Sequence, residues 1–236
     1  MNNQKDEALQ QMVDRLYSKD ANDRVKAASE LGEIGTSNEA PELLKATYND
    51  DQSTVRQMAI QSYAEIMKED GYDEIVKVVE SHEDMYVRLY AISVLAQFPQ
   101  SCDILAELLE SSNIQLKSAA IRSLIRIGLE MNVVIQSKVL EILKNNDNDI
   151  LLRNCIEALG LWGEKNSIPI ILEQLKTHPS SEIKTISAFS LALLGENAGK
   201  QYIEDNELDN FIRITYKGKI YRGKVGIKEI LSLNAL

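Results

Sequence analysis

Few side chains in this sequence have the chemistry of a catalytic or metal site. The histidines are His82 and His178, and the cysteines are Cys102 and Cys155. Zinc sites take four such ligands at short, regular spacings, whereas these residues are scattered along the chain. A cysteine activated by a histidine is conceivable, but Cys155 lies in an apolar segment, where a thiol is unreactive. With no glycine-rich phosphate loop either, we expect no cofactor, no metal and no enzymatic activity.

The chain consists largely of repeated copies of one apolar helix, and the clearest copy spans residues 151–163. The copies align on a central large residue, the anchor, at Leu31, Tyr63, Leu95, Leu124, Leu159 and Leu191. Successive anchors are 32, 32, 29, 35 and 32 residues apart. A period in the low thirties is typical of a helical solenoid.

When the six copies are aligned on their anchors, the same type of residue recurs at fixed positions around each anchor. Four residues before the anchor the side chain is always small: Ala27, Ala59, Ala91, Ala120, Cys155 and Ser187. Three before it the residue is always apolar: Ala28, Ile60, Ile92, Ile121, Ile156 and Ala188. These positions share one helix face with the anchor, so small residues there let a neighbouring helix approach closely. Six unrelated amphipathic helices would not keep that column small.

A second helix precedes each copy. Residues 5–18, 103–110 and 133–144 read as such first helices, with a short insertion around 130–132. The sequence therefore predicts an all-α solenoid of about six two-helix repeats over residues 5–200.

Residues 201–236 have a different pattern and are predicted to cap the solenoid. A short helix begins near Lys200, residues 211–225 alternate like a β-hairpin about Lys217–Gly218, and 226–236 form a last helix. We expect Leu231, Leu233 and Leu236 to face inward and cover the exposed end of the last repeat.

Composition limits the class of protein. The chain has 236 residues, 44% of them hydrophobic, which suffices for a large core. Its net charge of −10 opposes nucleic acid and anionic lipid. Two cysteines make no disulfide framework, and neither the N-terminal residues nor any later run has the apolar length of a signal or membrane segment. We expect a cytoplasmic protein without membrane contact, of unknown oligomeric state.

The second-helix segments resemble HEAT repeats, above all LGEIG at 31–35, VRLYAISVLAQF at 87–98 and EALGLWG at 157–163. The likeness covers roughly residues 5–200 and is closest to the short repeats of phycobilisome lyases. It implies antiparallel helix pairs in a right-handed superhelix whose second helices line the concave side. It also implies a recurrent basic column: Arg24, Arg56, Arg88, Lys117 and Lys184. Acidic turn residues, here Asp20, Asp51, Asp84 and Asp149, usually partner it, and the column forms inter-repeat salt bridges or binds a ligand.

The concave face suggested by this resemblance holds the positions two before and two after the anchors. It is polar and acidic early, basic in the middle and apolar late, so we expect a protein partner there. The candidate partner-binding residues are Gln61, Glu65, Arg122, Arg126, Glu157, Leu161, Phe189 and Leu193. The other reading is that the C-terminal tail packs on the apolar end.

Three further functions deserve mention. Bilin-lyase chemistry follows from the fold resemblance alone, with no residue that marks a bilin site. His82–Glu83 resembles one of the several His–Glu pairs that hold iron in HEAT-repeat deoxyhypusine hydroxylases. Residues 211–236 carry six basic and one acidic residue, a net +5 against −15 for the preceding 210, and Tyr216 and Tyr221 lie among them. This tail is the one segment that favours nucleic acid, which we do not expect the acidic body to bind.

Overall fold

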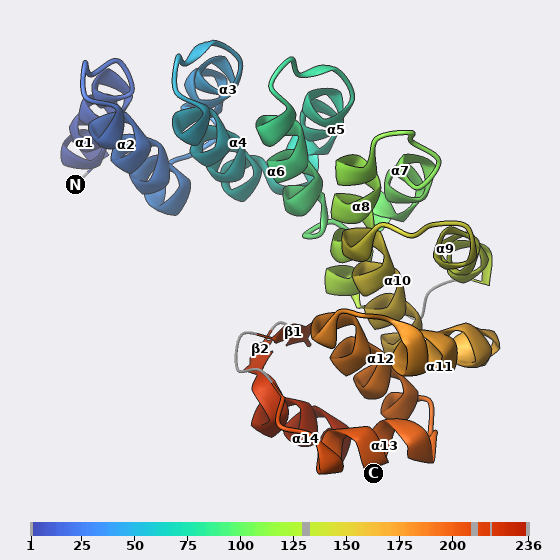
Figure 1. Cartoon of the computed structure of the whole chain (residues 1–236). Coiled ribbons are helices and arrows are strands. Elements are labelled where there is room, and N and C mark those ends of the chain that lie inside the picture. The colour runs from blue at the N-terminus through green and yellow to red at the C-terminus, as the bar shows by residue number, and fades with distance from the viewer. Residues whose placement is uncertain (1, 129–132, 209–211, 218, 235–236) are drawn as a thin grey trace. The chain divides into compact units, whose positions relative to one another are not determined.

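The computed structural model describes residues 2–128, 133–208, 212–217 and 219–234 (Figure 1). Helices follow one another in pairs, as the sequence predicts. The first helices of the pairs are α1 (Asn2–Arg15), α3 (Ala40–Asn49), α5 (Tyr72–Ser81), α7 (Cys102–Leu108), α9 (Val133–Lys144) and α11 (Ile168–Thr177). The second helices are α2 (Ala21–Ile34), α4 (Ser53–Met67), α6 (Met85–Leu95), α8 (Ile114–Ile127), α10 (Asp149–Leu161) and α12 (Ser181–Leu193). The predicted insertion at 130–132 lies outside the described residues.

The chain divides into two compact units, one ending at Ile104 and the other beginning at Leu105. In the first unit α2, α4 and α6 pack side by side in chain order, and each first helix packs against its own second helix. In the second unit α8, α10 and α12 do the same, with α9 and α11 beside them (Figure 1). The second helices thus form the continuous layer of each unit. Among the described residues no helix is long and apolar enough to cross a membrane.

The predicted columns form the core. All six small residues four before the anchors are completely buried, and so are all six apolar residues three before them. Gly32, directly after its anchor, shows how closely two second helices approach, since a Cβ there would lie 2.7 Å from Ser62 Oγ on the next second helix. Such close approach gives the dense packing typical of protein interiors.

Polar turn residues set where the second helices begin. Asp84 accepts a hydrogen bond from the Tyr86 N–H, and Asn148 accepts one from the Ile150 N–H, so each satisfies a backbone donor that the first helical turn leaves open. Asp20, Asn113 and Ser180 cap α2, α8 and α12 in the same way. Gly128 ends α8 in the left-handed region, with φ of 66°.

Ion pairs join successive repeats of the first unit through the basic column. Arg24 donates from Nε to Asp50 Oδ2 at 2.7 Å and from Nη2 to Asp50 Oδ1 at 2.9 Å, and it also pairs with Asp51. Arg56 pairs with Asp84 one repeat further on. The predicted partners Asp51 and Asp84 are therefore confirmed, while Asp50 was not anticipated. Structural pairing is the role that these two arginines have.

The C-terminal residues form a helix, a hairpin and a helix, with boundaries shifted by about one turn from the prediction. α13 spans Asn197–Asp205, β1 (Arg213–Tyr216) pairs antiparallel with β2 (Lys219–Arg222), and α14 spans Gly223–Leu233. α14 packs against both strands and against α12. Leu231 is half-buried, but the inward orientation expected of Leu233 is wrong, since 51% of it is exposed. Leu236 lies outside the described residues.

Candidate functional site

The predicted binding residues all lie on second helices, but they differ in exposure. Gln61 and Glu65 are on α4, where Gln61 Nε2 donates to Glu65 Oε1 at 2.8 Å, and Glu65 is exposed. Arg122 and Arg126 are exposed one turn apart on α8. The positions two before and two after each anchor lie on one face of the second helix, which we call the second-helix face. Gln61, Glu65, Arg122 and Arg126 lie on this face. In each unit this face carries polar side chains.

The apolar end of the second-helix face departs from the prediction. Leu161 on α10 and Leu193 on α12 are half-buried. Glu157 is only 5% exposed and Phe189 is completely buried. The expectation that these two side chains are accessible to a partner is therefore wrong. The physical reason is the tail: α14 packs against α12, and Ile214, Ile227 and Ile230 of the tail are themselves buried. Covering a large apolar side chain such as Phe189 is worth about 1.5–3 kcal/mol, whereas Leu161 and Leu193 stay partly exposed.

The hairpin is held on α10 through its main chain. Arg153 Nη2 donates to the carbonyl oxygen of Arg213 at 2.8 Å. One turn further on, the Glu157 carboxylate receives a hydrogen bond from the backbone of Thr215. On α10 Arg153 is therefore the donor and Glu157 the acceptor, and both bind backbone groups of β1. These contacts do not depend on which side chains the strand carries. Main-chain hydrogen bonds of this kind are one way in which proteins hold extended polypeptides.

Arg153 links the hairpin to two helices. Its Nη1 donates to Glu157 Oε2 at 2.9 Å, and its Nε donates to Glu182 Oε1 of α12 at 2.8 Å. Burial raises the pKa of Glu157 above its ordinary value, although the guanidinium of Arg153 acts in the opposite direction. Only Glu157 is buried in this cluster, since Arg153 is half-buried and Glu182 is exposed, so the guanidinium of Arg153 offsets the cost of burying the Glu157 carboxylate.

Two of the residues considered for metal or nucleophilic chemistry, His82 and Cys155, are buried. His82 is buried, with Nε2 donating to the Thr47 carbonyl at 2.9 Å and Nδ1 accepting from the Asp84 N–H at 3.0 Å, so both ring nitrogens are in use. Burial raises the pKa of Cys155 to about 12, which keeps the thiol protonated. Within the described part of the chain, no three histidine, cysteine, aspartate or glutamate residues are grouped so as to hold a metal ion.

Comparison with known proteins places this fold. No protein-family model matches the sequence, and neither does any curated protein. The X-ray structure of E. coli YibA, a HEAT-repeat protein, superposes with a TM-score of 0.61 at 18% identity, over 98% of this chain and 82% of YibA. The chain has a HEAT-repeat fold.

Two other HEAT-repeat structures are similar to a lesser degree. The complex of CpcE and CpcF of phycocyanin lyase from Nostoc sp. PCC7120 gives a TM-score of 0.40 at 15% identity, over 83% of this chain and 92% of that one. Human deoxyhypusine hydroxylase in complex with glycerol gives 0.36 at 12% identity, over 97% and 83%.

Arg153, which lies on the second-helix face, was not identified from the sequence. It stands one position outside the basic column, six residues before its anchor rather than seven. A signal was present, because it is the one charged residue in the apolar run 150–156 and Glu157 follows it by one helical turn. Nothing in the repeat pattern indicates that its third partner is the main chain of residue 213.

Proposed function

We propose that this protein is a non-catalytic binding module that holds an extended polypeptide segment on its second-helix face. The observation that supports this most is the grip of Arg153 and Glu157 on the backbone of the chain's own hairpin. Main-chain contacts of this kind do not depend on the sequence of the bound strand. A face built to engage one strand in this way is suited to engaging another.

The second unit offers the adjoining surface. Arg122 and Arg126 on α8 are exposed to solvent, and the half-buried Leu161 and Leu193 lie on the next two second helices. Guanidinium groups bind carboxylates in a planar, two-point geometry, while partly exposed leucines accept apolar side chains. The partner segment that fits this surface is therefore acidic, with apolar residues near its charges. In the first unit Gln61 and Glu65 offer a polar face whose carboxylate suits an uncharged or basic stretch of a partner rather than an acidic one.

A second function, nucleic-acid contact through the tail, has one specific observation in its favour. Arg213 and Arg222 are exposed and directly opposite each other in the hairpin register. Like charges at facing positions destabilise a strand pair unless an anion lies between them. A gel-shift assay at low salt, comparing the full chain with an Arg213→Ser, Arg222→Ser variant, tests this function, and equal absence of binding in both removes it.

The primary proposal is tested by affinity purification from the native cell, followed by mass spectrometry. The bait is the full chain, compared with an Arg122→Glu, Arg126→Glu variant and with a control in which the exposed Lys176 and Lys200 are changed to Glu. We expect a partner that the wild type and the control retain and the arginine variant loses. If the arginine variant keeps every partner of the wild type, the proposed face is wrong.

A further inference from the structure

The basic column that joins the repeats changes its chemistry between the fourth and fifth repeats. Lys117 has in the fourth repeat the place that Arg24 has in the first, seven residues before the anchor. Asn146 has in the fifth repeat the place of Asp50 in the second, thirteen residues before the anchor. An ion pair joins Arg24 to Asp50, whereas the equivalent junction holds a lysine and an amide.

The turn around Asn146 is otherwise the same as the turn around Asp50. Asp50 Oδ1 accepts from the Gln52 N–H at 2.9 Å, and Asn146 Oδ1 accepts from the Asn148 N–H at 2.8 Å. This bond fixes the amide orientation, because the atom that faces a backbone N–H must be the oxygen. The remaining atom of Asp50 is an oxygen that accepts from Arg24, and the remaining atom of Asn146 is Nδ2, a donor.

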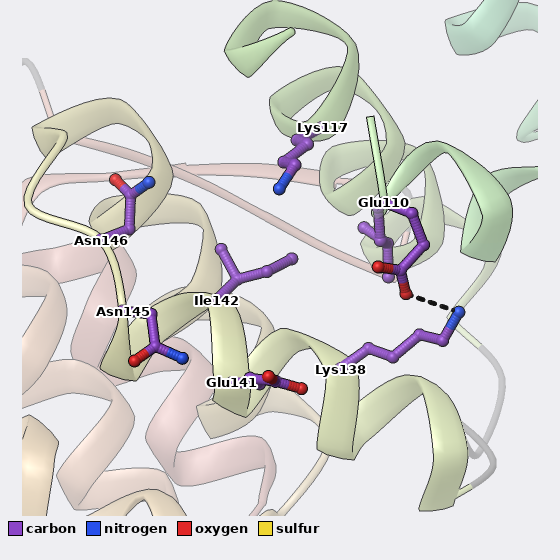
Figure 2. Close-up of a pocket in the computed structure, with 8 residues that line it drawn as sticks. Glu110, Lys117, Lys138, Glu141, Ile142, Asn145 and Asn146 are labelled. Atoms are coloured by element: carbon purple, nitrogen blue, oxygen red, sulfur yellow. Dashed lines mark ion pairs between the residues drawn. The ribbon is translucent and has the colours of Figure 1, made fainter. Parts of the chain in front are cut away.

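Two donors therefore meet where an acceptor is missing. Figure 2 shows the Lys117 ammonium and the Asn146 amide nitrogen facing the same space, with Ile142 beside it. Among the residues that the structure describes, neither nitrogen has a hydrogen-bond acceptor. Both point into a cavity of about 190 Å³, which is roughly six times the volume of a water molecule in the liquid.

The rest of the lining limits which anion fits this cavity. Glu110 and Lys138 form an ion pair of 2.8 Å at its side, which Figure 2 marks with a dashed line, so their charges offset each other. Glu141 adds one negative charge at the exposed rim, against the one positive charge of Lys117. A singly charged group is therefore favoured over a phosphate dianion or a polyanion, which Glu141 would repel.

We propose that this cavity binds a carboxylate, which takes the place that the Asp50 carboxylate has in the first ion pair. One carboxylate oxygen accepts from Lys117 and the other from Asn146 Nδ2, and Ile142 and Leu109 contact the carbon atoms next to the carboxylate. The carboxylate belongs either to a small organic acid or to an acidic side chain of a polypeptide. The site is separate from the second-helix face and does not depend on the function proposed for it.

The test is a titration of the full chain followed by ¹⁵N NMR of the backbone amides of residues 145–148, which every variant retains, and of the Asn146 side-chain amide in the chains that carry it. The probes are succinate, a short amidated and acetylated peptide with one central glutamate, and inorganic phosphate. We expect a saturable shift with succinate, with the peptide or with both, and the responding probe identifies the source. Phosphate is expected to bind more weakly than either.

Two variants address the site itself. Lys117→Met removes the charge and keeps the chain length, while Asn146→Asp supplies the missing carboxylate from the protein and repels the ligand. Each is expected to weaken binding by about tenfold or more. Lys144→Met, at an exposed position outside the lining, should leave it unchanged. The proposal is overturned if no carboxylate probe gives a saturable shift, if both site variants still bind as the wild type does, or if phosphate binds as tightly as the carboxylates.

Discussion

The backbone of Gly160 on α10 lies directly against Ser190 on α12. A Cβ built on Gly160 would be 2.7 Å from the Ser190 Cα and 2.5 Å from its Oγ, which is closer than atoms pack without a shift. The same hydroxyl donates to the carbonyl oxygen of Ile156 at 2.8 Å. The glycine in the middle of the repeat motif is thus what lets two second helices approach and hydrogen-bond across their interface.

Replacing Gly160 with alanine should destabilise the second unit. Alanine gains about 1 kcal/mol over glycine in a helix interior, but forcing a methyl group into this contact costs about 1–3 kcal/mol. Because the obstacle includes backbone, we expect the cost to exceed the gain, and urea unfolding should show a lower midpoint. Introducing Ser190→Gly as well should restore part of the loss. A Gly160→Ala variant more stable than the wild type would contradict the close approach.

The Arg56–Asp84 pair should make the first unit sensitive to acid. Burial alone would raise the pKa of Asp84, but hydrogen bonds from Arg56, Ser53 and the Tyr86 N–H lower it from 3.8 to about 2. A carboxyl with a lower pKa in the folded state stabilises the fold above its unfolded pKa. That stabilisation, on the order of 1–2 kcal/mol, is lost as the pH falls from about 4 to about 2.

Unfolding free energies measured across this pH range check the role of Asp84. An Asp84→Asn variant should be less stable near neutral pH and should lose less stability on acidification than the wild type. Asp70→Asn, at an exposed position, serves as the control and should follow the wild-type curve. Parallel curves for the wild type and Asp84→Asn would show that the pair does not contribute.

The repeats could be predicted from the sequence because their determinants are local and periodic. A small residue such as Ala59 recurs at a fixed distance from an anchor, and only one helix face satisfies that spacing. The burial of Phe189 could not be predicted in this way, because its position is exposed or half-buried in the first four repeats and is buried only in the last two, which pack against the tail. The bond between Arg153 and the carbonyl of Arg213 spans 60 residues and involves a backbone atom, which leaves no pattern in side-chain types.

The two cysteines should react very differently with thiol reagents. Cys155 is completely buried and its pKa is raised to about 12, so little thiolate forms and the reagent cannot reach it. Cys102 is partly exposed, although burial raises its pKa as well. Mass spectrometry after maleimide treatment should therefore show one modification in the native protein and two in denaturant. Cys102→Ser should leave the native protein unmodified, and equal labelling of both thiols without denaturant would be the contrary result.

The hold of Arg153 on the hairpin gives the most direct test of how the tail occupies the second-helix face. Arg153→Met keeps most of the side-chain volume and removes the hydrogen bonds to the Arg213 carbonyl, Glu157 and Glu182. A hydrogen bond to a charged group contributes about 1.5–3 kcal/mol, so backbone amides in β1 and α14 should exchange about 10- to 100-fold faster with deuterium. The control is Lys176→Met on the exposed side of α11.

Two results of that exchange measurement have different meanings. Faster exchange confined to the tail means that polar contacts hold the hairpin in place, and a partner strand that makes the same contacts with α10 can compete with it. Unchanged exchange means that the buried Ile214, Ile227 and Ile230 suffice to hold the tail. In that case the apolar end of the face is permanently covered, and a partner must bind through the polar groups of α8 in the second unit and α4 in the first.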